Sequence, residues 1–373
     1  MSIARRILAA SAILGLTAAC SPGGTTGPET TPTGTTSSAA GGQASETTEA
    51  TAGETTEATA DKTESDTLTV VTHDSFALPD ELKAKFAEES GYDVKYVAPG
   101  DAGALVNQLI LTKDAPLGDV VYGIDNAFAG RASDEGVLVD YESPALPATA
   151  NQFDAENVTP IDFGDVCINA DKVWFTEKGI PVPTTLDDLV KPEYKDLLVV
   201  TSPTSSSPGF AFLAATIGAK GDGWLDYWKQ LKDNGLKVTS GWTEAYYTDF
   251  SGADGKGPRP LVLSYATSPS YTVADGESTT EALLGTCFRQ VEYAGVIEGA
   301  ENQVGAEKFI DFLLSPEVQA AMPTEMYMYP VVSDTPLPEE WVKFAPLSPN
   351  PIAVENLAEN RDEWIREWAE AIG

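Results

Sequence analysis

The residues best suited to bind a small molecule fall in the segment 240–271. One tryptophan and four tyrosines gather there among small hydroxyl residues: Trp242, Tyr246, Tyr247, Tyr265 and Tyr271. Several aromatic faces beside hydroxyls, with few basic groups, suit a flat organic cation, which gains about 0.5 to 2 kcal/mol of cation–π attraction from each well-placed ring. The alternative for such a segment is a mixed aromatic core beside a loop.

This segment also contains the end of a predicted strand. Residues 260–265 (PLVLSY) have the apolar character of a buried strand and run directly into a turn, Ala266-Thr267-Ser268-Pro269. Open α/β sheets bind their ligands at the carboxyl ends of the strands. The sequence therefore places the aromatic residues where a binding cleft is expected.

A second candidate site is the helix start in TSSSPG. Ser206 or Ser207 at the N-cap with Pro208 in the first turn is a strong signal for a helix N-terminus. The free backbone N–H groups there, together with the serine hydroxyls, can hold a phosphate or an alcohol oxygen. The alternative is a helix cap that binds nothing.

Catalytic and metal-binding patterns are absent from the sequence. It has no GxSxG, HExxH or CxxC motif, and one histidine, His73, would have to serve any Ser-His or metal arrangement alone. Paired acids could still hydrolyse a glycoside, but His73 followed by Asp74 is more typical of a polar loop than of a catalytic dyad. We expect a protein that is not an enzyme and that has neither metal nor cofactor.

The net charge and the chain length further limit the kinds of protein and partner that are possible. A net charge of -34 would repel a phosphate backbone, so we expect no nucleic-acid partner. An acidic surface tolerates or attracts cationic solutes, although it also serves solubility. The chain is long enough for two lobes with their own cores.

The first 20 residues have the pattern of an export signal. Arg5 and Arg6 precede an apolar run that is too short for an ordinary membrane span. Cys20 follows small residues, as in a bacterial lipobox, where the thiol is acylated and the preceding residues are removed. We expect a lipid anchor on the outer face of the cytoplasmic membrane. The alternative is a plain secretory signal with an incidental cysteine.

Residues 21–66 are built from Thr, Glu, Gly, Ala and Ser with almost no large apolar side chain. Such a segment cannot bury enough surface to offset its ordering entropy. We predict a disordered tether with an end-to-end distance of roughly 35 to 40 Å.

From residue 67 onward, strand and helix patterns alternate. The strand TLTVVT is followed by a helix over 79–89, a strand near 94–97, a helix with Leu105 and Leu109, and the strand DVVYGI. This alternation implies right-handed crossovers and a mainly parallel sheet. The loops after the first and third strands, at the carboxyl edge where a ligand cleft is expected, would carry His73, Asp74, Ser75, Asp125 and Asn126.

The pattern restarts near Ile161, and the segment from Thr286 (TCFRQVEYAGVI) has the character of a strand that returns to the first lobe. We therefore predict an α/β fold of two lobes, each a mainly parallel sheet flanked by helices, joined by two hinge crossovers. The predicted boundaries are 67–161 with 288–330 for lobe 1, and 162–287 with 331–373 for lobe 2.

The remaining cysteines lie in the predicted crossovers. With Cys20 acylated, Cys167 and Cys287 are left in an exported domain, where a leftover pair usually oxidises. A disulfide between them would close a loop of about 120 residues and contribute on the order of 4 to 5 kcal/mol in the chain-entropy model. The alternative is two buried free thiols.

Several motifs together resemble the periplasmic thiamine-binding proteins of ABC importers. They follow the order of that family: VVTHDSFA, GDAGALVNQL, DVVYGIDNAF, TSSSPG, GWTEAY, LVLSYATSPSY and MPTEMYMYPVV. The resemblance covers nearly everything from Thr67 to the C-terminus. It implies a type II periplasmic-binding-protein fold.

The resemblance also implies a set of ligand contacts: Asp101, Ala102, Ser206, Ser207, Trp242, Tyr265, Ala266, Thr267 and Ser268, with Tyr271 and Tyr327 beside them. Rings would sandwich the aminopyrimidine and thiazolium, and a carboxylate would accept from the pyrimidine amine or offset the positive charge. Asp101 is the first candidate for that carboxylate, followed by Asp74 and Asp125. His73, Tyr327 and Ala102 stand where the compared relative has tyrosine, tryptophan and glycine.

The function that this resemblance implies is a lipid-anchored, monomeric receptor. It would capture thiamine, thiamine monophosphate or thiamine diphosphate and deliver it to an ABC permease and its ATPase, touching the membrane only through its anchor. A second possibility within the same fold is a ferric-ion receptor, because Tyr246-Tyr247 resembles the adjacent tyrosines with which related importers hold iron.

Overall fold

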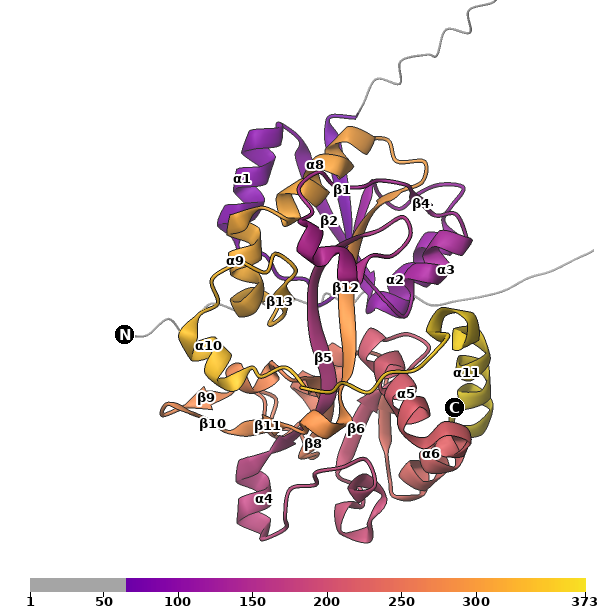
Figure 1. Cartoon of the computed structure of the whole chain (residues 1–373), viewed down its shortest axis with the longest axis vertical. Coiled ribbons are helices and arrows are strands. Elements are labelled where there is room, and N and C mark those ends of the chain that lie inside the picture. The colour runs from indigo at the N-terminus through magenta and orange to yellow at the C-terminus, as the bar shows by residue number, and fades with distance from the viewer. Residues whose placement is uncertain (1–64) are drawn as a thin grey trace, which may run out of the picture. The chain divides into compact units, whose positions relative to one another are not determined.

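The computed structural model describes residues 65–373 (Figure 1). The predicted export signal, Cys20 and all but the last two residues of the predicted tether lie outside the described residues. Within 65–373, no helix has the length and apolar character needed to cross a membrane.

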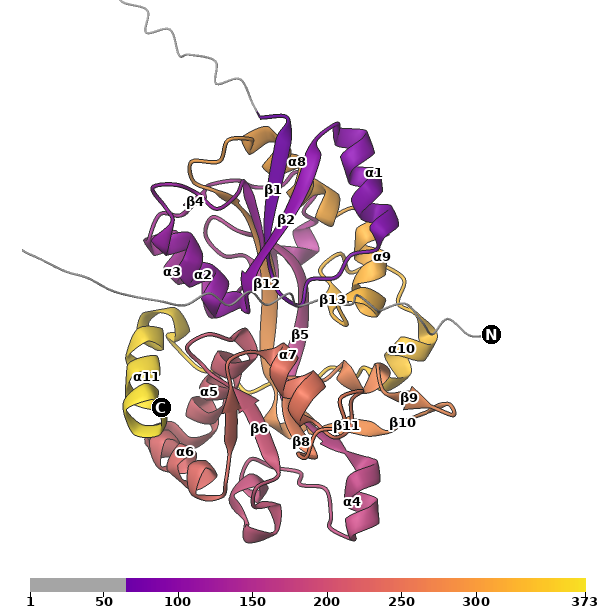
Figure 2. The same ribbon diagram turned by 180° about the vertical axis from the view of Figure 1, so that it is seen from behind.

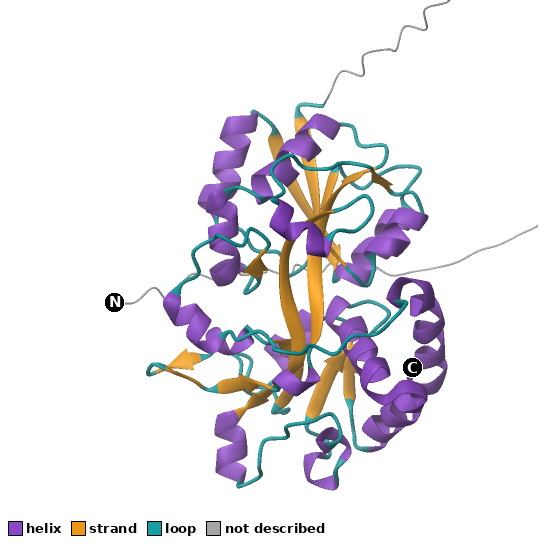
Figure 3. Ribbon diagram, in the orientation of Figure 1, coloured by secondary structure: helices purple, strands orange, loops and turns teal. Residues whose placement is uncertain are grey.

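One sheet runs through both halves of the described chain, in the order β2-β1-β3-β12-β5-β8-β6-β7. Its two central strands, β5 (Thr159–Asp171) and β12 (Phe288–Ile297), pair antiparallel and extend from the upper half of the molecule into the lower half (Figure 1, Figure 3). We call β5 and β12 the hinge strands. They are the two crossovers that the sequence predicts, and the α/β fold of two lobes is confirmed.

Lobe 1 is the half of the structure above the middle of the hinge strands in Figure 1. Its parallel strands are β1 (Thr67–His73), β2 (Asp93–Gly100) and β3 (Val120–Asp125), with the short β4 (Leu138–Val139) and β13 (Tyr329–Pro330) pairing with the hinge strands. Its helices are α1 (Asp80–Ser90), α2 (Ala102–Leu111), α3 (Ala129–Asp134), α8 (Gln303–Leu313) and α9 (Pro316–Glu325). Figure 2 shows β2 at the outer edge of the sheet, beside α1.

Lobe 2 is the lower half. Its strand β6 (Leu198–Thr201) lies parallel to both β7 (Lys237–Thr239) and β8 (Leu261–Tyr265), and β8 pairs antiparallel with β5. Its helices are α4 (Lys172–Lys178), α5 (Ser207–Lys220), α6 (Trp224–Asp233), α7 (Trp242–Glu244), α10 (Glu339–Phe344) and α11 (Leu357–Ile372). The small strands β9 (Val273–Ala274), β10 (Glu277–Ser278) and β11 (Thr280–Ala282) complete it. The exact lobe boundaries stay a prediction.

Local sequence signals account for the elements that reach the cleft. Helix α1 begins with Asp80 and Glu81, whose charges favour a helix N-terminus, and ends at Gly91 in the left-handed conformation (φ 76°). Helix α5 is buried from Ser207 to Ile217 on every side, because it packs against the sheet, α6 and the C-terminal region. Its apolar sequence all round is typical of such a central helix.

A disulfide bond joins Cys167 and Cys287. Cys167 is part of β5, and Cys287 immediately precedes β12, where the register places the two residues directly opposite each other. Both are fully buried and pack against Ala266. The bond therefore ties the two hinge strands together at their lobe 2 ends.

Candidate functional site

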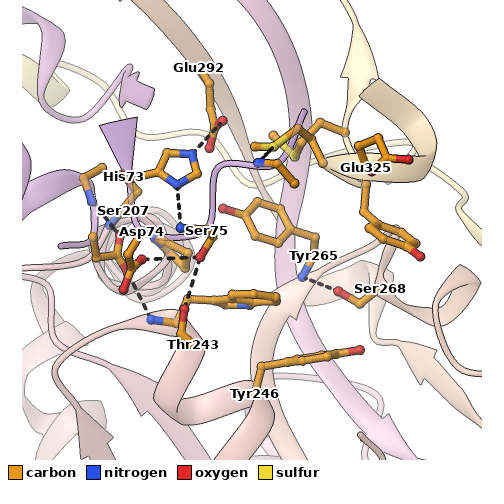
Figure 4. Close-up of a pocket in the computed structure, with 18 of the residues that line it drawn as sticks. His73, Asp74, Ser75, Ser207, Thr243, Tyr246, Tyr265, Ser268, Glu292 and Glu325 are labelled. Atoms are coloured by element: carbon orange, nitrogen blue, oxygen red, sulfur yellow. Dashed lines mark hydrogen bonds and ion pairs between the residues drawn. The ribbon is translucent and has the colours of Figure 1, made fainter. Parts of the chain in front are cut away.

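A cavity of about 260 Å³ lies between the lobes, beside the carboxyl ends of the parallel strands of each lobe (Figure 4). Lobe 1 and the hinge line it with His73, Asp74, Ser75, Ala77, Asp101, Ala102, Glu292, Glu325, Met326, Tyr327 and Met328. Lobe 2 lines it with Ser207, Pro208, Trp242, Thr243, Tyr246, Tyr247, Tyr265, Ser268 and Tyr271. The position at the strand ends is the one that open α/β sheets use for ligands.

The structure brings ten of the fourteen predicted ligand contacts to this cavity: His73, Asp74, Asp101, Ala102, Ser207, Trp242, Tyr265, Ser268, Tyr271 and Tyr327. Four others do not line it: Ser206, Ala266, Thr267 and Asp125. Each of these four is almost completely buried. They support the residues that line the cavity.

Hydrogen bonds explain why two of these side chains turn away. The Ser206 hydroxyl donates to Oγ1 of Thr201 at 2.9 Å. Oδ1 of Asp125 accepts from the backbone N–H groups of Ala127 and Phe128 at 3.0 and 3.1 Å. Asp125 was expected in a loop but is the last residue of β3, and burial raises the pKa of its carboxyl to about 7.

The aromatic wall of lobe 2 is built on a short irregular helix. Residues Ala245–Asp249 form a π-helical turn directly after α7, a distortion that is frequent at functional sites. Trp242 and Tyr246 stack with ring centroids 4.8 Å apart, and the indole N–H donates to Oγ of Ser264 at 2.9 Å. Tyr246 is 2% exposed and Tyr247 is 37% exposed, so only one tyrosine of the pair is a core residue.

Asp101 connects the two lobes. It is the N-cap of α2, and its Oδ1 accepts from the backbone N–H of Ala102 at 2.7 Å and of Ser207 at 3.4 Å. Its Oδ2 accepts from the N–H of Trp242 at 3.0 Å. Burial raises the pKa of the carboxyl, and these hydrogen bonds act in the opposite direction.

Two further contacts cross the cleft. The hydroxyls of Ser75 and Thr243 lie 3.2 Å apart, and the rings of Tyr271 and Tyr327 meet edge to face with centroids 5.5 Å apart. Tyr327 has a φ of 56°, a left-handed conformation that is uncommon for a tyrosine and is typical of functional segments. The lobes therefore touch on both sides of the cavity.

Below the cavity lies a buried polar network that the sequence did not predict. The Tyr122 hydroxyl lies 2.5 Å from Oδ2 of Asp162 and 2.9 Å from Oε2 of Glu292. Burial, with the nearby Glu292 carboxylate, raises the pKa of Asp162 well above its usual range, and the hydrogen bond from Tyr122 acts in the opposite direction. Gln290 donates to Glu292 and to the Tyr265 hydroxyl, both at 3.0 Å.

His73 belongs to this network. It ends β1, and its Nδ1 accepts from the backbone N–H of Ser75 at 3.1 Å, so the neutral ring carries its proton on Nε2. Nε2 lies 3.5 Å from Oε2 of Glu292 (Figure 4). Among residues 65–373, no three His, Cys, Asp or Glu side chains are grouped to hold a metal ion.

Ser75 lines the cavity as its predicted loop position implies, whereas sequence reasoning missed Thr243, Glu292, Glu325 and the two methionines of the cavity. Glu292 did carry a signal. With Gln290 two residues earlier it forms a polar face in an otherwise apolar strand, and a buried carboxylate in such a place is uncommon without a specific partner.

Comparisons with known proteins agree with this architecture. Residues 115–268 match the family model described as bacterial extracellular solute-binding protein. The "Thiamine-binding periplasmic protein" of Escherichia coli (strain K12) is 31% identical over 317 residues, covering 82% of this chain and 93% of that protein. The protein of the same name from Brucella suis biovar 1 is 31% identical, with coverages of 82% and 92%.

Among solved structures, a "Periplasmic thiamin binding protein" superposes with a TM-score of 0.72 at 29% identity, covering 82% of this chain and 96% of that chain. The similarity thus extends over both lobes and the cavity between them. This chain belongs to the thiamine-binding periplasmic protein family of bacterial extracellular solute-binding proteins.

Proposed function

We propose that this protein is an extracytoplasmic receptor that binds thiamine, as the free vitamin or as its mono- or diphosphate, and delivers it to a membrane permease. One observation carries the proposal. Both lobes contribute to a single cavity in which stacked aromatic rings lie beside uncompensated carboxylates. This combination suits a flat organic cation.

The cavity offers a partner for each part of thiamine. Trp242, Tyr265 and Tyr271 present ring surfaces for the aminopyrimidine and the thiazolium. The carboxylates of Asp74 and Glu325 can offset the permanent positive charge or accept from the pyrimidine amine. Asp101 is less available for that role than its position suggests, because three backbone N–H groups already surround it.

The protein's task is transport, and it performs no chemistry. Ligand binding stabilises contact between the lobes, and the permease distinguishes the loaded from the empty receptor by shape. We further propose that Cys20 is acylated, that the receptor acts as a monomer, and that an ATPase drives the permease. The names of its relatives support the exported location and the binding role.

The ferric-ion alternative has weaker support. Tyr246 stacks on Trp242, lies edge-on to Tyr247 and is almost completely buried. Packing of its ring is therefore sufficient to explain why a tyrosine stands at this position. Within residues 65–373, no group of three or more His, Cys, Asp or Glu side chains is placed to hold a metal ion.

Isothermal titration of the purified, unliganded protein tests the proposal. Thiamine, its monophosphate, its diphosphate and ferric citrate are added in turn. One-to-one binding of at least one thiamine form supports the receptor function. Binding of ferric citrate without binding of any thiamine form would instead indicate a receptor for iron uptake.

A further inference from the structure

His73 lies where the strands β1, β3 and β12 meet the cavity. It is the last residue of β1, it is 7% exposed, and it lines the cavity beside Glu292 of β12. Its ring packs closely on the backbone of Gly123 in β3, so that a Cβ at this glycine would collide with Cδ2 of the imidazole. The ring is therefore held in place, and its neighbours must adjust to any change in its protonation.

Residues 73–76, which we call the β1 turn, depend on the neutral form of this ring. Nδ1 of His73 accepts from the backbone N–H of Ser75 at 3.1 Å, and the His73 carbonyl accepts from the N–H of Phe76 at 3.3 Å. The Ser75 hydroxyl lies 3.2 Å from the hydroxyl of Thr243 in lobe 2 (Figure 4). Neutral His73 thus positions a turn of lobe 1 for a contact across the cleft.

Protonation of the ring is incompatible with this arrangement. Both nitrogens of an imidazolium carry a hydrogen, so Nδ1–H would face the N–H of Ser75, two donors 3.1 Å apart with no acceptor between them. Because the ring is held against Gly123, the β1 turn must move away from it. Ser75 moves with the turn, and its contact with Thr243 is weakened.

The charges that face the ring favour the opposite outcome. Nε2 lies 3.5 Å from Oε2 of Glu292, and the carboxylates of Asp101 at the N-cap of α2 and of Asp74 in the β1 turn also act on the imidazole. The Tyr122 ring of β3 lies 5.7 Å away. Burial lowers the pKa of the imidazole, but these carboxylates, Glu292 above all, outweigh burial and raise the pKa above its usual value. The hydrogen bond inside the turn and the surrounding carboxylates therefore oppose each other.

We propose that His73 is a positioning residue whose protonation is coupled to ligand binding: the neutral imidazole holds the β1 turn against lobe 2, and the imidazolium releases it. The inference rests on the proposed function for one point, the positive charge of the thiazolium. A bound thiazolium and an imidazolium would compete for the same carboxylates, so the turn and the ligand both favour the neutral ring. Binding should expel the proton from His73, and the affinity for thiamine should fall as the pH falls.

The titration of His73 can be followed directly, because it is the only histidine of the chain. The Cε1 proton resonance of its imidazole is recorded by NMR on the untagged protein between pH 5.5 and 8.5, with and without saturating thiamine. We expect thiamine to lower the midpoint by at least about 0.7 pH, which corresponds to an affinity about fivefold lower for the protonated receptor. An unchanged midpoint would overturn the inference.

Two variants separate positioning from charge. His73→Asn does not titrate in this range and keeps an acceptor for the Ser75 N–H, because an asparagine oxygen bonds to the backbone two residues on. Between pH 8.0 and 6.0 the affinity of the natural protein for thiamine should fall about threefold or more, and that of the variant much less. The comparison removes the contribution of Asp125, whose carboxyl also titrates near pH 7. His73→Phe keeps a ring without an acceptor and should bind weakly at both pH values.

The outcomes separate this inference from the proposed function. An equal pH dependence in the natural protein and His73→Asn, or the natural affinity at pH 8.0 in His73→Phe, would overturn the inference and leave the receptor function standing. Circular dichroism checks that both variants fold, and the NMR titration decides without them. Absence of thiamine binding to the natural protein at every pH would overturn the proposed function and this inference with it.

Discussion

The backbone N–H of Trp242 in lobe 2 donates a 3.0 Å hydrogen bond to Oδ2 of Asp101 in lobe 1. A carboxylate acceptor makes this bond stronger than one between neutral groups. It forms only when the lobes approach, and it lies beside the indole that stacks on Tyr246. The same residue, Trp242, therefore takes part both in the contact between the lobes and in the aromatic wall of the cavity.

Replacement of Asp101 tests this coupling. Asp101→Ser keeps a good N-cap for α2 but removes the charge and the reach to Trp242. Loss of a hydrogen bond to a charged group costs about 1.5 to 3 kcal/mol, so we expect thiamine affinity to fall by roughly 10- to 100-fold. The melting temperature of the unliganded protein should change little. Unaltered affinity in this variant would show that the contact does not contribute to closure.

Trp242→Ala should abolish most ligand affinity while the protein remains folded. Trp242 is half-buried, and a tryptophan at the centre of a binding site is typically worth at least about 2 kcal/mol, or roughly 30-fold in affinity. Trp174→Ala is the control, since Trp174 is a half-buried tryptophan of lobe 2 that does not line the cavity. Titration with thiamine and circular dichroism check both variants. Equal affinities in the two would exclude the aromatic stacking model.

The disulfide between Cys167 and Cys287 should stabilise the fold substantially. Substituting both by alanine should lower the free energy of unfolding by about 2 to 5 kcal/mol, as measured by urea denaturation. Thiol labelling of the unfolded, unreduced protein should find neither cysteine reactive. Two labelled thiols would mean that the bond does not form in the purified protein.

Asp125 should make stability depend on pH. Burial raises the pKa of this carboxyl from about 3.9 in the unfolded chain to about 7 in the folded protein. The folded state therefore binds the proton more tightly, and the carboxyl destabilises the fold progressively as the pH rises from about 4 to 7.

Asp125→Asn removes that titration and can keep the Oδ1 contacts to Ala127 and Phe128. Its free energy of unfolding should exceed that of the natural protein by about 1 to 3 kcal/mol at pH 8 and by much less at pH 5. Denaturation curves at the two pH values measure this. An identical difference at both would show that the carboxyl keeps an ordinary pKa.

Ferric citrate should produce no tyrosinate-to-iron colour in the visible spectrum. Burial raises the pKa of the Tyr246 and Tyr247 hydroxyls, and Tyr246 is the more deeply buried of the two. Loss of the phenol proton, which iron binding requires, is therefore unfavourable at both tyrosines. A charge-transfer band that disappears in Tyr247→Phe would instead support the iron-binding alternative.

Most of the fold could be predicted from local sequence patterns. The alternation of apolar strands with helices predicts β1, α1 and β3 closely, and the restart near Ile161 identifies the first hinge strand. These features depend on periodicity and on end signals such as Gly91, which act within a few residues. The sequence pattern also places His73 at a strand end that faces the cleft, and the family resemblance identifies Asp101 as a cavity residue.

The direction of individual side chains depended on tertiary structure. Asp125 was expected in the loop after its strand, yet it is the last residue of β3, and its carboxyl accepts from the N–H groups of Ala127 and Phe128. Glu292 shares a face of β12 with Gln290, but which face lines the cavity is fixed by the pairing of β12 with β3 and β5. Such pairing joins segments that are far apart in the sequence, so local patterns do not determine it.

The bond between Cys167 and Cys287 also limits how the receptor can open. It joins residues that stand directly opposite each other, so the two long strands cannot slide past one another at their lower ends. Bending of the strands away from this fixed point would let the lobes separate, so the bond favours a hinge motion over a sliding motion between the two strands.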